Sequence, residues 1–221
     1  MKENLTELVF ILDMSGSMFP LAADTIGGFN GMIEKQKKEE GEALVSLVVF
    51  DDESEVLLDR APLETVKPLT DADYCPRGCT ALLDAMGDAI HHIGNVHKYA
   101  REEDRPAHTV FVITTDGMEN ASRRFSSDKV KSLVTKQKEK GWEFLFLGAN
   151  IDAVEAARNV GIGADRAVEY LNDEEGVQLN YKVISGAISH MRALRAEESC
   201  IDASWKDEIE ADRKKRSPGK H

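Results

Sequence analysis

Short apolar runs alternate with longer amphipathic stretches along this chain. The runs are rich in Val, Ile, Leu and Phe without polar alternation, which is typical of strands buried on both faces. Because such runs are only three to seven residues long, they fit strands better than helices. The expected strands are 8–12, 44–50, 56–58, 109–114, 144–147 and 167–169.

Between most of these runs, apolar residues recur three and four positions apart, which predicts helices with one face against a sheet. Asp152 is a candidate N-cap for a further, shorter helix, because its side chain can accept a backbone hydrogen bond. The longer apolar stripes begin at Ile26, Leu82, Val130 and Val177.

The step from the second strand to the third differs from the others. Phe50 and Val56 are separated by five polar residues, too few for a helical crossover. Strand 56–58 is therefore expected to pair antiparallel at an edge. The whole pattern predicts an α/β fold: a doubly wound, mostly parallel six-stranded sheet with one antiparallel edge strand and helices on both faces.

The composition suits one globular domain, assigned to residues 1–199, in a chain of 221 residues that is 42% hydrophobic and 31% charged. The formal net charge of −12 argues against binding to nucleic-acid phosphates or anionic membranes. The N-terminal apolar run, 8–12, is too short for a signal-peptide core or a membrane span. We therefore expect a cytoplasmic protein.

Residues 200–221 are strongly charged and are expected to form a flexible tail, because they offer little apolar surface to bury. A nucleic-acid arm at the basic end fits poorly with an acidic protein. Cys75 and Cys79 are expected to be incidental thiols. With Cys200 they make an odd number, and no histidine completes a zinc site with them.

The first predicted strand ends in Asp13-Met14-Ser15-Gly16-Ser17. This places a carboxylate and two hydroxyls on a tight turn at the carboxyl end of a strand, where open α/β sheets bind ligands. Gly16 permits a sharp turn, so that Asp13, Ser15 and Ser17 can face the same small space. Such oxygen ligands suit a hard cation such as magnesium.

Two further residues join this candidate site. Asp116 follows the fourth strand, and strands one and four are plausible neighbours where the strand order reverses. Thr80 stands just before the second helix, where its hydroxyl can cap that helix or reach the cation. Each residue also has a purely structural interpretation, as a turn, cap or strand-end residue.

The set Asp13, Ser15, Ser17, Thr80 and Asp116, in this order and spacing, resembles the metal-ion-dependent adhesion site of the von Willebrand factor type A (vWA) family. The resemblance covers nearly all of residues 5–195. It implies that these five residues hold one divalent ion, Mg²⁺ or alternatively Mn²⁺ or Ca²⁺. It also implies that a Glu or Asp carboxylate of a partner protein completes the metal's ligands.

Other polar residues near this edge are expected to have supporting roles. Glu119 and Asn120 are expected to cap the loop and the following helix, although either could contact a partner. Asp51 and Asp52 are expected to be solvated in the hairpin turn. Asn150 follows the fifth strand and can border the site without binding the cation.

These observations favour a metal-dependent protein-binding module, a scaffold or assembly factor, over an enzyme. A phosphatase of the haloacid dehalogenase type needs a second aspartate two positions after Asp13, where this chain has Ser15. No G-x-S-x-G or phosphate-binding glycine motif supports a serine hydrolase or a nucleotide site. The remaining alternatives are a metal-dependent hydrolase and a fold-only interaction protein with a vestigial metal site.

Overall fold

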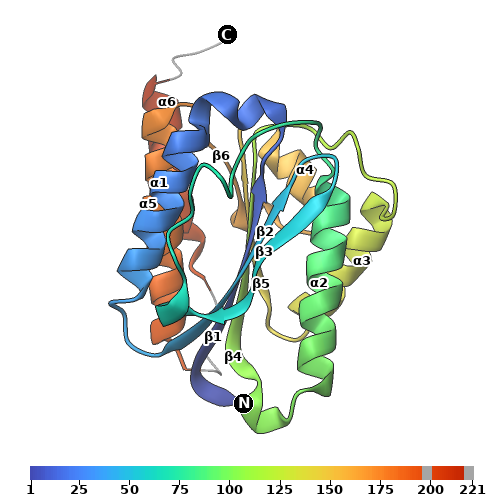
Figure 1. Cartoon of the computed structure of the whole chain (residues 1–221), viewed down its shortest axis with the longest axis vertical. Helices are drawn as coiled ribbons and strands as arrows, with labels where there is room; N and C mark the ends of the chain where they lie inside the picture. The colour runs from blue at the N-terminus through green and yellow to red at the C-terminus, as the bar shows by residue number, and fades with distance from the viewer. Residues whose placement is uncertain (196–200, 217–221) are drawn as a thin grey trace.

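One six-stranded sheet, in the order β3-β2-β1-β4-β5-β6, lies between two layers of helices in the computed structural model (Figure 1). The structure describes residues 1–195 and 201–216. All neighbouring strands pair parallel except β2 and β3, which pair antiparallel. The strands are β1 (Lys2–Asp13), β2 (Glu42–Phe50), β3 (Ser54–Pro62), β4 (Pro106–Thr115), β5 (Glu143–Gly148) and β6 (Ala167–Glu169).

The two faces of the sheet carry separate apolar cores. Alternate residues of β1 divide between them: Phe10 packs with α1 and α5, whereas Ile11 packs with α2, α3 and α4. The near-continuous apolar runs therefore belong to strands covered on both sides, as expected. The helices are α1 (Ala22–Gln36), α2 (Leu82–Tyr99), α3 (Ser127–Lys138), α4 (Ala153–Asn159), α5 (Glu174–Ala193) and α6 (Asp207–Arg216).

The predicted fold class is confirmed, including the antiparallel edge strand and the adjacency of β1 and β4. Several strands are longer than their apolar runs, and β1 contains the fully buried Glu7. The carboxylate of Glu7 accepts from Arg60 Nε at 2.9 Å and lies 3.3 Å from His97 Nε2. Arg60 supplies the positive charge that a buried carboxylate requires.

The structure differs from the expected flexible tail for residues 201–216. This segment forms a 3₁₀ turn, Ala203–Lys206, and helix α6, which pack against α5 and β6. Ile201, Trp205 and Ile209, spaced four apart, supply the apolar contacts, and both isoleucines are fully buried. This short apolar stripe was not recognised in the sequence, because most of the residues around it are charged. Residues 200 and 217–221 of the predicted tail lie outside the described residues.

Within the described ranges, none of the helices has the length and apolar character needed to cross a lipid bilayer.

Candidate metal centre

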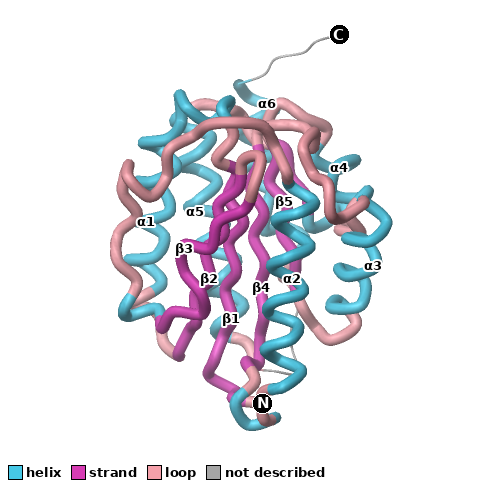
Figure 2. Tube along the Cα trace, turned by 45° about the vertical axis from the view of Figure 1, so that its right-hand side comes forward, coloured by secondary structure: helices cyan, strands magenta, loops and turns pink. Residues whose placement is uncertain are grey.

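Loops from several elements gather over the carboxyl ends of the parallel strands, at the edge opposite the N-terminus (Figure 2). Asp13 is the last residue of β1, and Asp116 follows the last residue of β4. The register pairs Leu12 with Thr114, so the two strands end side by side. The topology therefore brings both predicted aspartates to one point of this edge.

A chain of short contacts joins four of the five predicted residues. Ser15 donates its backbone N–H to Asp13 Oδ1 at 2.8 Å, and its hydroxyl lies 3.1 Å from that of Ser17. Ser17 in turn donates its hydroxyl to Asp116 Oδ1 at 2.5 Å. The turn after β1 thus places both serine hydroxyls between the two carboxylates. Asp13, Ser15 and Asp116 are buried, whereas Ser17 is exposed.

Thr80 lies beside the same cluster. A Cβ added at Gly117 would lie 3.3 Å from Thr80 Oγ1 and 3.9 Å from Ser17 Oγ, so both hydroxyls flank this glycine. Asn120 fixes the Thr80 backbone, since its side chain accepts from Thr80 N at 2.9 Å and its N–H donates to Thr80 O at 3.1 Å. The helix-cap interpretation of Thr80 is wrong, because the N-cap position of α2 is occupied by Ala81.

Neutral groups, rather than cations, surround the two carboxylates. Thr115 donates its hydroxyl to Asp13 Oδ2 at 2.5 Å, and Asn172 donates to Asp116 Oδ2 at 3.3 Å. No ion pair formed within residues 1–195 and 201–216 includes Asp13 or Asp116. Burial raises the pKa of Asp13, although hydrogen bonds from Ser15 and Thr115 act in the opposite direction.

Three residues of this centre were not predicted from the sequence: Tyr74, Thr115 and Asn172. Thr115 could have been suspected from its place beside Asp116 at the strand end. Tyr74, which donates its hydroxyl to the backbone oxygen of Asp13, and Asn172 come from distant loops that carry no recognisable motif.

The loop residues at this edge mostly hold the backbone. Glu119 accepts from the backbone N–H groups of Leu83, Ala121 and Ser122, so it caps α2 and its own loop. The expected solvation of Asp51 is wrong: it is buried and accepts from Arg77 Nε at 2.7 Å. This ion pair fixes the loop that leads to Thr80.

Two neighbouring features make no hydrogen bond to the cluster within the part of the chain that the structure describes. Asp52 accepts from the backbone N–H of Cys79 at 3.3 Å. Cys75 and Cys79 are exposed free thiols, and Cys200 lies outside the described residues.

The donor set fits a hard cation. Among the residues that the structure describes, no three His, Cys, Asp or Glu side chains form a metal-binding group. The cluster instead combines two carboxylates with three hydroxyls, which are oxygen ligands of the kind that Mg²⁺ prefers.

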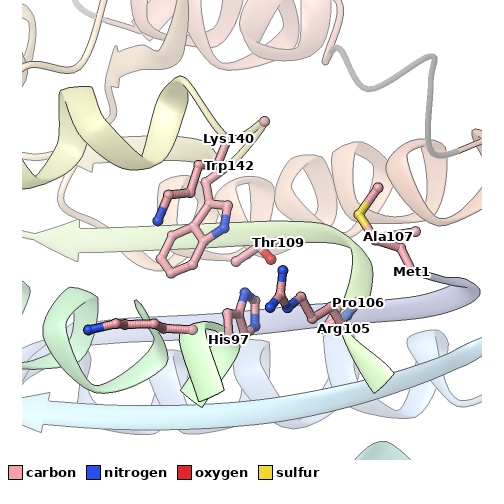
Figure 3. Close-up of a pocket in the computed structure, with 10 residues that line it drawn as sticks. Met1, His97, Arg105, Pro106, Ala107, Thr109, Lys140 and Trp142 are labelled. Atoms are coloured by element: carbon pink, nitrogen blue, oxygen red, sulfur yellow. The ribbon is translucent and has the colours of Figure 1, made fainter. Parts of the chain in front are cut away.

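A cavity of about 400 Å³ lies at the opposite edge of the sheet (Figure 3). Four basic side chains line it: His97, Lys98, Arg105 and Lys140. Arg105 donates to the carbonyl oxygen of Ala100, just after the end of α2, from Nε at 3.2 Å and from Nη2 at 3.1 Å. Basic residues at a helix C-terminus offset its partial negative charge, so this cluster has a structural role that needs no ligand.

No protein-family profile matches the sequence, and a search of curated proteins finds no match. Solved structures, in contrast, match at low identity. Proximal thread matrix protein 1 from the mussel byssus, in a form described as having a zinc-occupied MIDAS motif, is 14% identical with a TM-score of 0.59. The match covers 85% of this chain and 46% of the mussel protein, so this chain spans about half of that relative's length.

Two bacterial structures give the same result. A von Willebrand factor type A protein from Catenulispora acidiphila is 16% identical, with a TM-score of 0.53 over 86% of this chain and 43% of its own. The vWF domain of the type V pili tip protein Mfa5 from Porphyromonas gingivalis is 10% identical, with a TM-score of 0.59 over 86% of this chain and 97% of its own. At these identities the comparison concerns the fold, and the chain therefore has the fold of a von Willebrand factor type A domain.

Proposed function

We propose that this chain is a divalent-cation-dependent protein-binding module. In this proposal, one Mg²⁺, or alternatively Mn²⁺ or Ca²⁺, is held by the five residues at the carboxyl edge: Asp13, Ser15, Ser17, Thr80 and Asp116. The observation that carries the proposal is the pair of buried carboxylates, neither of which binds a basic side chain of the described residues. The zinc-occupied MIDAS motif of the mussel protein supports a metal at the equivalent place in this fold.

The charge balance of the cluster supports a divalent ion. Isolated buried charges cost several kcal/mol each, roughly, unless a partner compensates them. Elsewhere in this chain buried carboxylates do have such partners, as Glu7 has Arg60 and Asp51 has Arg77. Asp13 and Asp116 together carry the charge that one divalent cation would neutralise.

The mixture of ligands favours recognition of an acidic group. Ser15, Ser17 and Thr80 contribute neutral oxygens, so only the two aspartates offset the charge of the ion. A bound ion supplies an electrophilic position that accepts one more oxygen, and a Glu or Asp carboxylate of a partner protein is the best match. We infer that the chain acts in this way as an intracellular scaffold or assembly factor.

Catalysis by the same residues is less well supported. Ser15 occupies the position where a phosphatase of the haloacid dehalogenase type needs an acid/base aspartate. The hydroxyls of Ser15 and Ser17 contact each other, and Ser17 also contacts Asp116. A histidine base is absent from these contacts. We therefore propose a binding protein rather than a hydrolase.

Isothermal titration calorimetry with MnCl₂ and MgCl₂ tests the metal site directly. We expect the wild-type protein to bind one ion and Asp13→Ala to lose this binding. Asp71→Ala, which removes an exposed aspartate from a surface loop, should bind as the wild type does. Equal binding by Asp13→Ala, or no binding by the wild type, would refute the proposal.

A pull-down from the native cell tests the protein-binding role. Partner capture should require magnesium and should be lost with EDTA or with Asp13→Ala. Capture that persists in EDTA would instead favour the fold-only interaction protein.

A further inference from the structure

An apolar pocket of about 420 Å³ adjoins the candidate metal centre. It lies between the start of α2, the loop after Asp116 and helix α4, and its volume is within the range of small-ligand sites. Its apolar lining comes from Leu82, Leu83, Met118, Ile151 and Val160.

The pocket and the metal centre share one residue, Gly117, as a border. Gly117 forms part of its wall, and the Thr80 and Ser17 hydroxyls flank this same glycine. Met118 is 75% exposed, although large apolar side chains are usually covered. Phe19, two residues after Ser17, is 73% exposed. Apolar surface is therefore open to a ligand on the loops that carry the metal-binding residues.

The charges around the pocket determine which part of a ligand can enter it. The charged residues that line it are all acidic: Glu119, Asp152 and Glu155. Glu119 and Asp152 already accept backbone hydrogen bonds, and no lysine or arginine lines the pocket. A ligand carboxylate would be repelled from this pocket, whereas a cation in the metal centre would attract it.

We propose that this pocket receives a large aliphatic or aromatic side chain next to the acidic residue of the partner. The partner segment would thus combine one Asp or Glu, bound to the metal, with an apolar neighbour in the pocket and few other acidic residues. This inference rests on the proposed metal-dependent function and specifies the partner's chemistry.

Simple carboxylates can test the two parts separately. The affinities of acetate, hexanoate and 1-hexanol are measured by NMR chemical-shift titration of the ¹⁵N-labelled chain, with MgCl₂ and with EDTA. In magnesium, hexanoate should bind at least about tenfold more tightly than acetate, because its additional methylene groups would be buried in the pocket. In EDTA, the affinity for hexanoate should fall to that for 1-hexanol.

Variants of the pocket wall test whether the pocket causes the higher affinity for hexanoate. Met118→Ser and Leu83→Ala should each reduce the preference for hexanoate over acetate at least about threefold and leave acetate binding unchanged. Tyr99→Ser, which removes an exposed aromatic ring at the far end of α2, should keep the full preference.

The outcomes distinguish failure of the inference from failure of the proposed function. Equal binding of acetate and hexanoate in magnesium overturns the pocket inference alone. Hexanoate binding that is as tight in EDTA as in magnesium also overturns it, because the pocket then acts without the metal. Absence of magnesium-dependent acetate binding overturns both.

Discussion

Asp13 and Asp116 differ in their partners from the buried carboxylates of Glu7 and Asp51, each of which pairs with an arginine. Neutral hydrogen-bond donors hold them, with Thr115 on Asp13 and with Ser17 and Asn172 on Asp116. Hydrogen bonds of this kind orient a carboxylate without neutralising it. The arrangement leaves the charge available to a cation, and it makes the orienting groups part of the site.

We expect Thr115→Val to weaken Mn²⁺ binding by roughly 10–100-fold, the usual effect of losing a group that orients a metal ligand. Valine matches threonine in shape, but it cannot donate to Asp13 Oδ2 or accept from Gly117 N. Calorimetry measures the affinity, and circular dichroism checks that the fold is kept. Thr135→Val, on the exposed surface of α3, is the matched control and should bind normally. An unchanged affinity in Thr115→Val would show that Asp13 needs no orienting hydroxyl.

Residues of the candidate site could be predicted where they belong to one contiguous motif. Asp13, Ser15 and Ser17 share one turn, so the sequence alone could place them together. Tyr74 could not be predicted, because its contact with Asp13 depends on how a long loop packs over the sheet.

At the scale of elements, helix α2 is anchored by the loop that follows β4. The first N–H groups of α2 donate to that loop, Leu83 N to Glu119 at 2.8 Å and Asp84 N to Ser122 Oγ at 3.0 Å. The Asp84 carboxylate returns the interaction, accepting from three backbone N–H groups, those of residues 123–125. These bonds tie the segment that carries Thr80 to the segment that carries Asp116.

Asp84→Asn should lower the free energy of unfolding by about 1–3 kcal/mol at pH 7, because an amide cannot accept all three hydrogen bonds. Burial acts to raise the pKa of Asp84, but the three backbone donors outweigh it and the pKa lies below the ordinary value of 3.8. Folding thus favours the charged form. The stabilisation is complete at neutral pH and is lost as the pH falls below about 4.

Urea unfolding at pH 7 and at pH 3.5 measures this dependence. The difference between wild type and Asp84→Asn should be largest at pH 7 and smaller at pH 3.5. Asp71→Asn, at an exposed position, should match the wild type at both. A difference that does not change with pH would mean that the charge of Asp84 is not what stabilises the loop.

The elements themselves were largely predictable, because apolar runs and helical stripes report burial directly. Their limits were not. Strand β1 begins at Lys2 and includes Glu7, although a charged residue is unfavourable in a buried strand. Glu7 is accommodated because Arg60 and His97 contact its carboxylate. Such compensation by distant residues cannot be recognised in a local sequence pattern.

At the scale of the whole molecule, the strand order reverses between β1 and β4, and the candidate centre lies at this switch point. The C-terminal segment packs on the side of the sheet covered by α1 and α5 (Figure 1). The sequence predicted a flexible tail here, because charged residues greatly outnumber apolar ones in this segment. Whether it unfolds together with the sheet decides how far the domain extends.

The two tryptophans can answer this question, because they lie in different layers. Trp142 belongs to the core beneath α2 and α3, whereas Trp205 packs on the other face and donates its indole N–H to Asp165 O at 2.9 Å. In a Trp142→Phe background, fluorescence reports on the C-terminal segment alone. We expect its urea transition to coincide with that of far-UV circular dichroism, as in a two-state domain.

Ile209→Ala then tests the packing of α6, since Ile209 is 2% exposed. We expect it to lower the free energy of unfolding by about 2–4 kcal/mol and to shift both transitions together. Val56→Ala, a comparable truncation at a 58% exposed position, should change stability by less than about 1 kcal/mol. An earlier Trp205 transition, with the circular dichroism transition unmoved by Ile209→Ala, would place the segment outside the cooperative unit. Coincident transitions would instead make residues 201–216 an integral part of the domain, despite their charge.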